Sequence, residues 1–336
     1  MAPLSKAIAL RSVSSSDEVT SVYAGIVDPD WNVASIPNGG YVLALVVEAS
    51  IRHQASTPLR DPIHVTAHFL RTTAVAEFEI HVRTLRTGKG FTNLVADFKQ
   101  QNEVKLTTHF IFGVLSPTSP LTEPLPTLAP PSRYARRIPL LTHPSRLTNT
   151  GWSRRPLGYM THIALVEDPM VQEHNQLPSI DDSNGKELEW AAWIELTVQS
   201  ERITTPSLAF LVDTFNNLPE LLAQRNYGNI KAGSQWFPTL TLTIEFKFPI
   251  PTSDEYAKRT VGIHARGRYI NNPQGRHETT VEVWSAPSNI GEGQGQPADV
   301  WRDKQVCLAV SSQMALVVPM AVNRRKGECA AGGPKL

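Results

Sequence analysis

The stretch SIPNGGYVLALVVEAS, residues 35–50, decides how the first half of the chain folds. A Pro, an Asn and two Gly precede a run of apolar residues that is about long enough for three helical turns. Because the apolar residues are nearly continuous, we predict a helix that is buried on most of its sides. Glu48 is the single acid in this run, so its role must be decided from the rest of the chain.

Strand-like segments surround this helix and complete a first unit. The segment SVYAGIVDPDWNV precedes it, and IHVTAHFL (63–70), FEIHVRTLRT (78–87), FTNLVADFKQ (91–100) and EVKLTTHFIFG (103–113) follow it. Apolar and polar residues alternate in several of them, which is typical of strands with one buried face. Turns are predicted at RTGKG and QQNE. The basic residues of the first turn, Arg86 and Lys89, either face solvent or contact substrate phosphates.

The same order of segments returns in the second half of the chain. The strand-like LEWAAWIELTVQS (188–200) leads into SLAFLVDTFNNLPELLAQ (207–224), which we predict to be one apolar helix. Four strand-like segments follow: TLTLTIEFKF (239–248), TVGIHARGRYI (260–270), HETTVEVWSA (277–286) and QVCLAVSSQMALVV (305–318). Residues 286–303, rich in Gly, Pro and Gln, form a predicted loop between the last two.

Two tandem α+β units are therefore predicted, each with antiparallel strands around one apolar helix. Residues 1–115 form the first unit and residues 151–336 the second. The segment 116–150 contains eight prolines and is predicted to be an extended linker that crosses the surface. Two such sheets placed edge to edge would make one continuous antiparallel sheet with two central helices.

Composition excludes several classes of function. The net charge of +1 gives no electrostatic reason to expect nucleic acid as a partner. Two cysteines cannot build a disulfide framework or a zinc site alone, so we expect no metal ion and no cofactor. No apolar run approaches the length of a membrane span, and the N-terminus lacks the apolar core of a signal peptide.

The C-terminal residues Gly-Gly-Pro-Lys-Leu are a near match to the Ser-Lys-Leu peroxisomal address. Pro334 departs from that pattern, and a tail without an address is the alternative. The expected location is therefore the cytoplasm or the peroxisome.

The order of segments, together with NGGYVLA (38–44) and LRTGKGFTNLVADFKQ (85–100), resembles the hotdog fold. More narrowly, it is similar to the double-hotdog acyl-CoA thioesterases of the thioesterase II and peroxisomal type. The resemblance covers about residues 20–115 and 186–318. It implies a pseudo-dimer of two hotdog repeats, an acyl-CoA or related acyl thioester as substrate, and assembly into homo-oligomers.

The resemblance also bears on Glu48. In simpler hotdog thioesterases the active acid lies seven residues after the second Gly, which here is Val47. Glu48 is one residue further, a rotation of about 100° around a helix. We therefore expect the first helix to be a structural element and the first repeat to hold a degenerate site.

The second repeat holds the residues that the resemblance implies are catalytic. Thioesterase II proteins use an Asp in the helix, a Thr near the start of the next strand and a Gln in the last strand. Asp213, Thr239 and Gln313 match this pattern, although Thr241 or Thr243 would replace Thr239 if the register slips. A lone carboxylate in an apolar helix also needs a partner or a role.

Alignment of the two repeats sets Val47, Pro62 and His109 opposite Asp213, Thr239 and Gln313, in that order. One working site per chain is what a duplicated and diverged pair should show. Asp213 is expected to accept a proton from an attacking water, with Thr239 and Gln313 fixing that water.

Backbone N–H groups of the turn formed by Asn38, Gly39 and Gly40 are candidate oxyanion donors, and a tight helix start is the alternative. Two other functions stay open. One is a hotdog dehydratase or cyclase, which would need His109 or His162 near Asp213. The other is a non-catalytic protein that binds acyl ligands.

Overall fold

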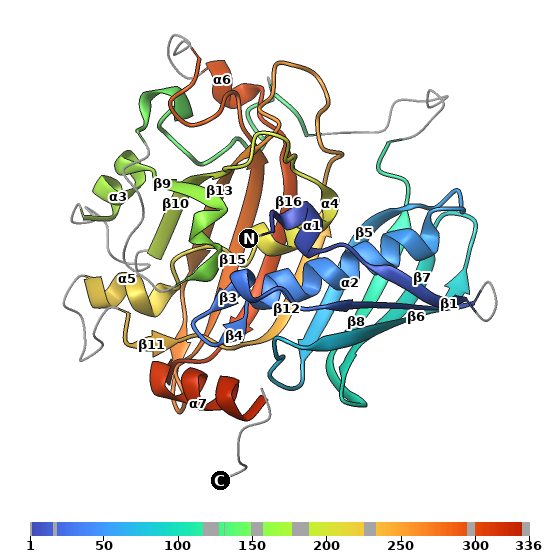
Figure 1. The fold of residues 1–336 in the computed structure, drawn as a ribbon. Helices are drawn as coiled ribbons and strands as arrows, with labels where there is room; N and C mark the ends of the chain where they lie inside the picture. The colour runs from blue at the N-terminus through green and yellow to red at the C-terminus, as the bar shows by residue number, and fades with distance from the viewer. Residues whose placement is uncertain are drawn as a thin grey trace.

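One antiparallel sheet runs through both halves of the chain (Figure 1). The computed structural model describes residues 2–15, 19–116, 128–130, 132–148, 157–176, 188–224, 233–293 and 300–330. From one edge to the centre, the first half contributes β1 (Arg11–Ser15), β2 (Thr20–Ile26), β6 (Glu77–Thr87), β7 (Thr92–Gln100), β8 (Glu103–Gly113) and β5 (Asp61–Phe69). The second half continues with β12 (Thr239–Phe246), β16 (Cys307–Ala315), β15 (Arg276–Ser285), β13 (Thr260–Gly267), β10 (Leu188–Leu196) and β9 (Ile163–Glu167), and the short β14 (Ile270–Asn271) pairs with β15.

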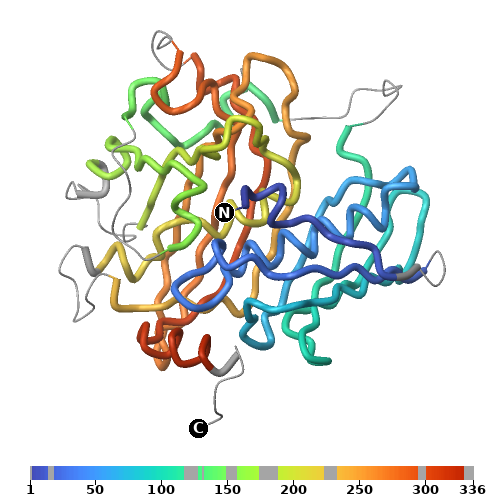
Figure 2. The backbone as a smooth tube through the Cα atoms, in the orientation of Figure 1, coloured from blue at the N-terminus to red at the C-terminus, as the bar shows by residue number. Residues whose placement is uncertain are grey.

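The two halves repeat the same architecture side by side, as the backbone trace in Figure 2 shows. The predicted order of strand, helix and four strands is confirmed in each of them. Strand β7 illustrates the cause, since its residues alternate between buried and half-buried from Thr92 to Gln100. It turns into β8 through Gln101 and Asn102, whose φ angles of 52° and 61° suit a tight two-residue hairpin.

Helix α2 (Gly39–Gln54) lies along the sheet of the first half (Figure 1). The Asn38 side chain caps it by accepting a hydrogen bond from the Tyr41 backbone N–H at 2.9 Å. Most of its residues are buried, as the sequence predicted. Glu48 points away from the core and pairs with Arg52 at 2.6 Å, one turn later, which agrees with a structural rather than a catalytic helix.

The single helix predicted over residues 207–224 is wrong, because two short helices occupy this segment. Helix α4 (Thr205–Leu211) ends at the C-cap residue Val212, and α5 (Leu218–Gln224) begins six residues later. The segment between the two helices contains Thr214, Asn216 and Asn217, whose side chains compete for backbone hydrogen bonds. Pro219 also constrains the backbone of the residue before it. Asp213 therefore lies in a turn after the helix and not within it.

A local two-fold axis passes through the centre of the sheet. Strands β5 and β12 place Thr66 directly opposite Thr243. Each strand also has a break in register at the same relative position, between Pro62 and His64 on β5 and between Thr239 and Thr241 on β12. The alignment of residues 62–69 with residues 239–246 is thereby confirmed. Val47 and Asp213 each come eight positions after the first residue of their helix, so their equivalence is also supported.

The alignment of the last strands is wrong by one residue. On β8 and β16, the partners of the central threonine pair are His109 and Ser312, so these two residues are equivalent. Gln313 therefore corresponds to Phe110 and not to His109. Successive side chains of a strand point to opposite faces of the sheet, so an alignment error of one residue pairs side chains from opposite faces. Accordingly, His109 is exposed whereas Gln313 is buried.

Described parts of the segment 116–150 and of the 286–303 insertion pack together against the second half. Ile138 and Leu140 are fully buried in a second apolar cluster that also contains Trp193, Trp284 and Trp301. The described part of the segment predicted to be a surface linker thus contributes to a core. Trp301 belongs to the short helix α6 (Val300–Asp303) within the insertion.

Smaller elements complete the described chain. They are α1 (Leu4–Ala7), α3 (Pro169–Gln176), the paired β3 (Asn32–Val33) and β4 (Ile36–Pro37), the paired β11 (Gln235–Trp236) and β17 (Val318–Pro319), the C-terminal α7 (Met320–Ala330), and short 3-10 turns at Pro29–Trp31, Pro144–Arg146 and Gly158–Thr161. None of the helices within the described ranges has the length and apolar character that crossing a membrane requires. The predicted targeting signal, residues 334–336, lies outside the described residues.

Candidate active site

Asp213 lies where the two halves of the chain meet. It follows the C-cap of α4 directly, and its Oδ2 accepts a hydrogen bond from the Gly40 backbone N–H at 2.8 Å. Gly40 is the second residue of α2, so the carboxylate sits at the positive end of that helix. An acid from the second repeat is therefore held by the first turn of the helix in the first repeat.

Gly40, the second of the two glycines that begin α2, is required by this close approach. A Cβ atom at Gly40 would lie 2.5 Å from the Ala209 carbonyl oxygen and 2.6 Å from the Asp213 Cβ. The Gly40 N–H is already bound to the carboxylate, so it is not a free oxyanion donor. The Gly39 N–H makes no hydrogen bond to any described residue, and Gly39 lines the cavity beside Asp213.

Thr239 and Gln313 form the second part of the site. The Thr239 hydroxyl donates to Gln313 Oε1 at 3.0 Å, which leaves the amide Nε2 for the Asp213 carboxylate, whose pKa it lowers. The contact between Gln313 Nε2 and the Asp213 carboxylate falls short of good hydrogen-bond geometry. Nε2 is therefore a buried donor with no well-aligned partner among the described residues. A buried donor without a partner is unusual, but Gln313 is not among the described residues that line the cavity, so its amide stands beside the carboxylate rather than in the cavity wall.

The environment of Asp213 makes it a stronger base than a free aspartate. Burial raises the pKa of its carboxyl group from 3.8 to about 6. Hydrogen bonds from the Gly40 backbone and from the Gln313 and Asn38 side chains act in the opposite direction, but burial outweighs them. A carboxylate with this pKa is ionised at neutral pH and accepts a proton more readily than an exposed one.

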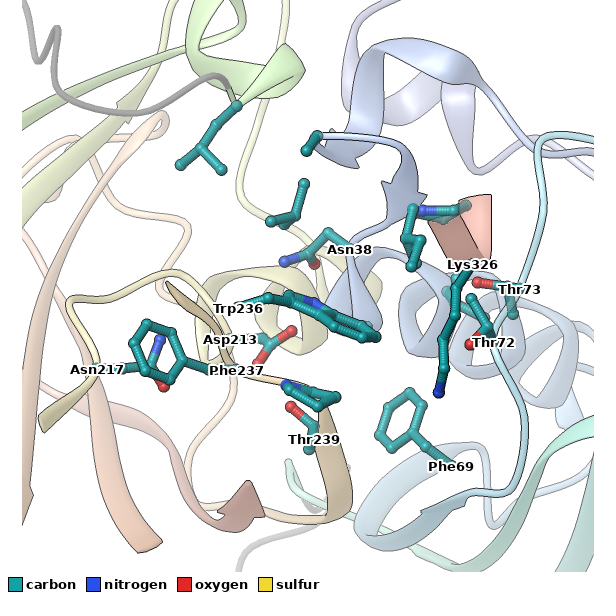
Figure 3. A pocket seen from close by; sticks show the side chains of 18 of the residues that line it. Asn38, Phe69, Thr72, Thr73, Asp213, Asn217, Trp236, Phe237, Thr239 and Lys326 are labelled. Atoms are coloured by element: carbon teal, nitrogen blue, oxygen red, sulfur yellow. The ribbon is translucent and has the colours of Figure 1, made fainter. Parts of the chain in front are cut away.

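A cavity of about 250 Å³ opens beside the carboxylate (Figure 3). Figure 3 shows Asp213 in the space between Asn38 and Thr239, so both repeats contribute to its polar wall. The rest of the lining is largely apolar and aromatic, and includes Phe69, Tyr159, Phe215, Trp236 and Phe237. An apolar cavity with a few converging polar groups is the usual form of a small-molecule site.

The structure brings the three predicted site residues together, and their catalytic roles stay predictions. Thr239 lines the cavity, whereas the alternatives Thr241 and Thr243 are not among its described lining. Thr243 instead donates to the Ser312 carbonyl oxygen at an exposed position. The register that selects Thr239 is therefore supported.

Several lining residues were not predicted from the sequence. Trp236 and Lys326 come from β11 and α7, which lie within the second predicted unit but outside the helix and strand segments predicted for it. Arg86 and Lys89, the cations of the predicted first turn, are exposed in the β6–β7 hairpin and are not part of the described lining. A basic residue in an amphipathic C-terminal segment carries no sequence signal that would place it over a distant cavity.

Family comparison matches most of the chain. A sequence model described as the acyl-CoA thioesterase N-terminal domain matches residues 27–113, and one described as the acyl-CoA thioesterase C-terminal domain matches residues 143–289. No curated protein matches the sequence.

Solved structures with a similar fold cover nearly the whole chain. A protein of unknown function with a hotdog fold from Alicyclobacillus acidocaldarius is 20% identical with a TM-score of 0.60, over 94% of this chain and 97% of that chain. An acyl-CoA thioesterase II, TesB2, from Mycobacterium marinum is 13% identical with a TM-score of 0.59, over 94% and 98%. A candidate thioesterase II from Thermobifida fusca YX is 17% identical with a TM-score of 0.65, over 94% and 99%. At these identities the likeness establishes the fold, a tandem pair of hotdog repeats.

Proposed function

Because the chain belongs to the acyl-CoA thioesterase family, we propose that it hydrolyses acyl-CoA by direct attack of water, with Asp213 as the proton acceptor. The family supports thioester hydrolysis in general, and the chain is a thioesterase on that ground. One observation carries the mechanism. A carboxylate with a raised pKa is fixed by a helix N–H beside a buried, poorly partnered amide, at the wall of an apolar cavity.

The proposed step needs only water and the thioester. A water molecule donates one hydrogen to the Asp213 carboxylate and accepts a hydrogen bond from Gln313 Nε2. As the water oxygen bonds to the thioester carbonyl carbon, its proton passes to Asp213 and the carbonyl oxygen becomes an oxyanion. The oxyanion then reforms the carbonyl, the carbon–sulfur bond breaks, and the leaving thiolate takes up the proton held by Asp213, which restores the carboxylate. Base assistance of this kind contributes about 10²–10⁴-fold to the rate.

The developing oxyanion needs a donor that is not already used. Gly39 fits, since its backbone N–H lies at the start of α2, faces no described partner and belongs to the cavity wall. A well-placed donor at such a position is worth about 10²–10³-fold in rate. In this proposal the two consecutive backbone N–H groups have different roles. The Gly40 N–H binds the Asp213 carboxylate, and the Gly39 N–H binds the substrate oxygen.

The structure does not favour the dehydratase alternative, which requires a histidine beside Asp213. His109 is exposed on the outer face of the sheet. His162 is buried, but its Nε2 lies 3.3 Å from Asp30 and its ring stacks on Trp31. Neither histidine is among the described residues that line the cavity.

The test is thiol release from a panel of acyl-CoA substrates, followed with a thiol reagent. The wild-type chain should release CoA, and Asp213→Asn should lose at least two orders of magnitude in rate. A matched control is Asp254→Asn, because the Asp254 side chain is fully exposed and should leave turnover unchanged.

A single turnover in heavy-oxygen water separates direct attack from a covalent route. With enzyme in excess, the label should enter the product acid and not Asp213, and no acyl adduct should be seen by mass spectrometry. Label in Asp213, or an acyl group attached to it, would replace the proposed mechanism with nucleophilic catalysis.

A further inference from the structure

Helix α7 is held against the cavity by contacts that the repeat pattern does not include. Strand β17 pairs with β11 and leads directly into the helix, whose first residue, Met320, donates its N–H to the Ser234 carbonyl oxygen at 2.9 Å. Met320 and Lys326 line the cavity. Figure 1 shows α7 at the lower end of the molecule, near β11 and β4. It contacts both of these strands and also β17.

Buried contacts fix the rotation of this helix. Asn323 is fully buried, accepts a hydrogen bond from the Ser35 N–H at 3.1 Å and donates to the Val33 carbonyl oxygen at 3.1 Å. A Cβ atom at Gly327 would lie 2.7 Å from the Ser35 carbonyl oxygen, so the helix packs closely on the loop between β3 and β4. Because Asn323 and Gly327 face that loop, Lys326 is directed to the cavity side.

The Lys326 ammonium lies over the Trp236 ring, with Nζ 5.8 Å from the ring centroid. Figure 3 shows the Lys326 side chain reaching across the cavity toward Phe69. A cation above an aromatic face is attracted to the ring and stays able to bind an anion on its other side. The ring thus positions the charge without neutralising it.

The charges around the cavity are unequal. Arg71 and Lys326 are the cations in its described lining, and Asp213 is the sole carboxylate there. Arg71 is exposed and pairs only loosely with Glu103, at 3.8 Å. A cavity mouth with two cations attracts an anionic ligand and raises its local concentration.

We propose that α7 is a substrate-recognition element in which Lys326, held on Trp236, binds an anionic group of the thioester, with Arg71 as a second contact. This inference rests on the proposed function, since it concerns the substrate of the same site. The anion is either a phosphate of the CoA moiety or a carboxylate at the far end of the acyl chain. A lysine binds both as a point charge.

The test compares kcat/KM for wild type and Lys326→Gln with four substrates. These are a plain acyl group and an ω-carboxyacyl group, each on CoA and on pantetheine, which lacks the phosphates. The variant should raise KM about tenfold for substrates that carry the recognised anion, with kcat nearly unchanged. If kcat/KM falls only for the two CoA substrates, the recognised anion is a CoA phosphate. If it falls only for the two ω-carboxyacyl substrates, the recognised anion is the carboxylate.

Arg324→Gln is the matched control, because Arg324 is exposed on the same helix and is not among the described lining residues. It should leave all four values unchanged, and Lys326→Arg should restore most of the loss. Equal losses for Arg324→Gln and Lys326→Gln, or no loss for Lys326→Gln with any substrate, would overturn the inference. Thermal unfolding of each variant checks that α7 stays in place.

Failure of the proposed function can be separated from failure of this inference. If wild type hydrolyses none of the four thioesters, the proposed function fails. Calorimetric titration with CoA and with the ω-carboxyacyl pantetheine then tests whether Lys326 still binds an anionic ligand. About tenfold weaker binding of either ligand to Lys326→Gln than to wild type supports recognition by α7. Equal binding to both proteins, or binding to neither, refutes it.

Discussion

Replacing Asp213 with asparagine should make the protein more stable at alkaline pH while it lowers the rate of catalysis by at least two orders of magnitude. The reason lies in the sign of the pKa shift. Burial raises the pKa of this carboxyl from 3.8 to about 6, so the folded state binds its proton more tightly than the unfolded chain does. Between these two values the folded state carries the extra proton, and the free energy of unfolding falls as the pH rises.

The magnitude follows from the shift itself. A rise of about two pKa units, at 1.36 kcal/mol each, corresponds to a penalty of about 3 kcal/mol once the pH is well above 6. At pH 4.5 the carboxyl group is largely protonated in the folded state, and the penalty shrinks to about 1 kcal/mol. The amide of the Asp213→Asn variant would keep an oxygen for the Gly40 N–H but carry no charge, so these figures are upper bounds for the gain.

The assay is thermal unfolding of wild type, Asp213→Asn and the exposed control Asp254→Asn at pH 8 and pH 4.5. The site variant should melt a few degrees above wild type at pH 8, with a smaller difference at pH 4.5. The control should follow wild type at both values. The reasoning is refuted if the site variant is less stable than wild type at pH 8, because the carboxylate would then be a net stabilising group of the folded state.

Four further outcomes are expected. The logarithm of kcat/KM should rise with unit slope up to about pH 6 and level off above it, since Asp213 accepts a proton only when ionised; a flat profile between pH 5 and pH 8 contradicts this. Gly40→Ala should lower both the melting temperature and kcat, because a methyl group would meet a backbone oxygen at 2.5 Å, whereas Gly90→Ala meets nothing within 4 Å and should be silent in both measurements. Glu48→Gln should leave turnover unchanged and cost at most about 0.5 kcal/mol in a denaturant titration, as its surface pair with an arginine is weak; a large loss of kcat would restore it as a catalytic candidate. Thr239→Val should lower kcat about tenfold or more with little change in KM, since the Gln313 amide loses the donor that orients it, and unchanged steady-state kinetics would remove this role.

The helix and strands of each repeat could be predicted because their signals are local. Alternating residues in β7 and the capped, apolar start of α2 at Asn38 need only a few neighbouring residues to be recognised. Because the chain contains two repeats, their sequences can also be aligned with each other, and this alignment matched β5 with β12 correctly. The same alignment misplaced Gln313 by one residue. Two strands of similar polarity can be aligned in registers that differ by one residue when the sequence does not show which face of each strand is buried.

The sequence by itself determined that the chain has two α+β repeats and that Asp213 is an acid among apolar residues in need of a partner. Only the tertiary structure decided what that partner is, since the Gly40 N–H comes from 173 residues earlier in the chain. The same holds for the cavity wall, where Lys326 and Trp236 come from elements outside the helix and strand segments that the sequence predicted. Local periodicity specifies which face of an element is buried, but the atoms that meet across an interface depend on how whole elements pack, and that packing has no local signature.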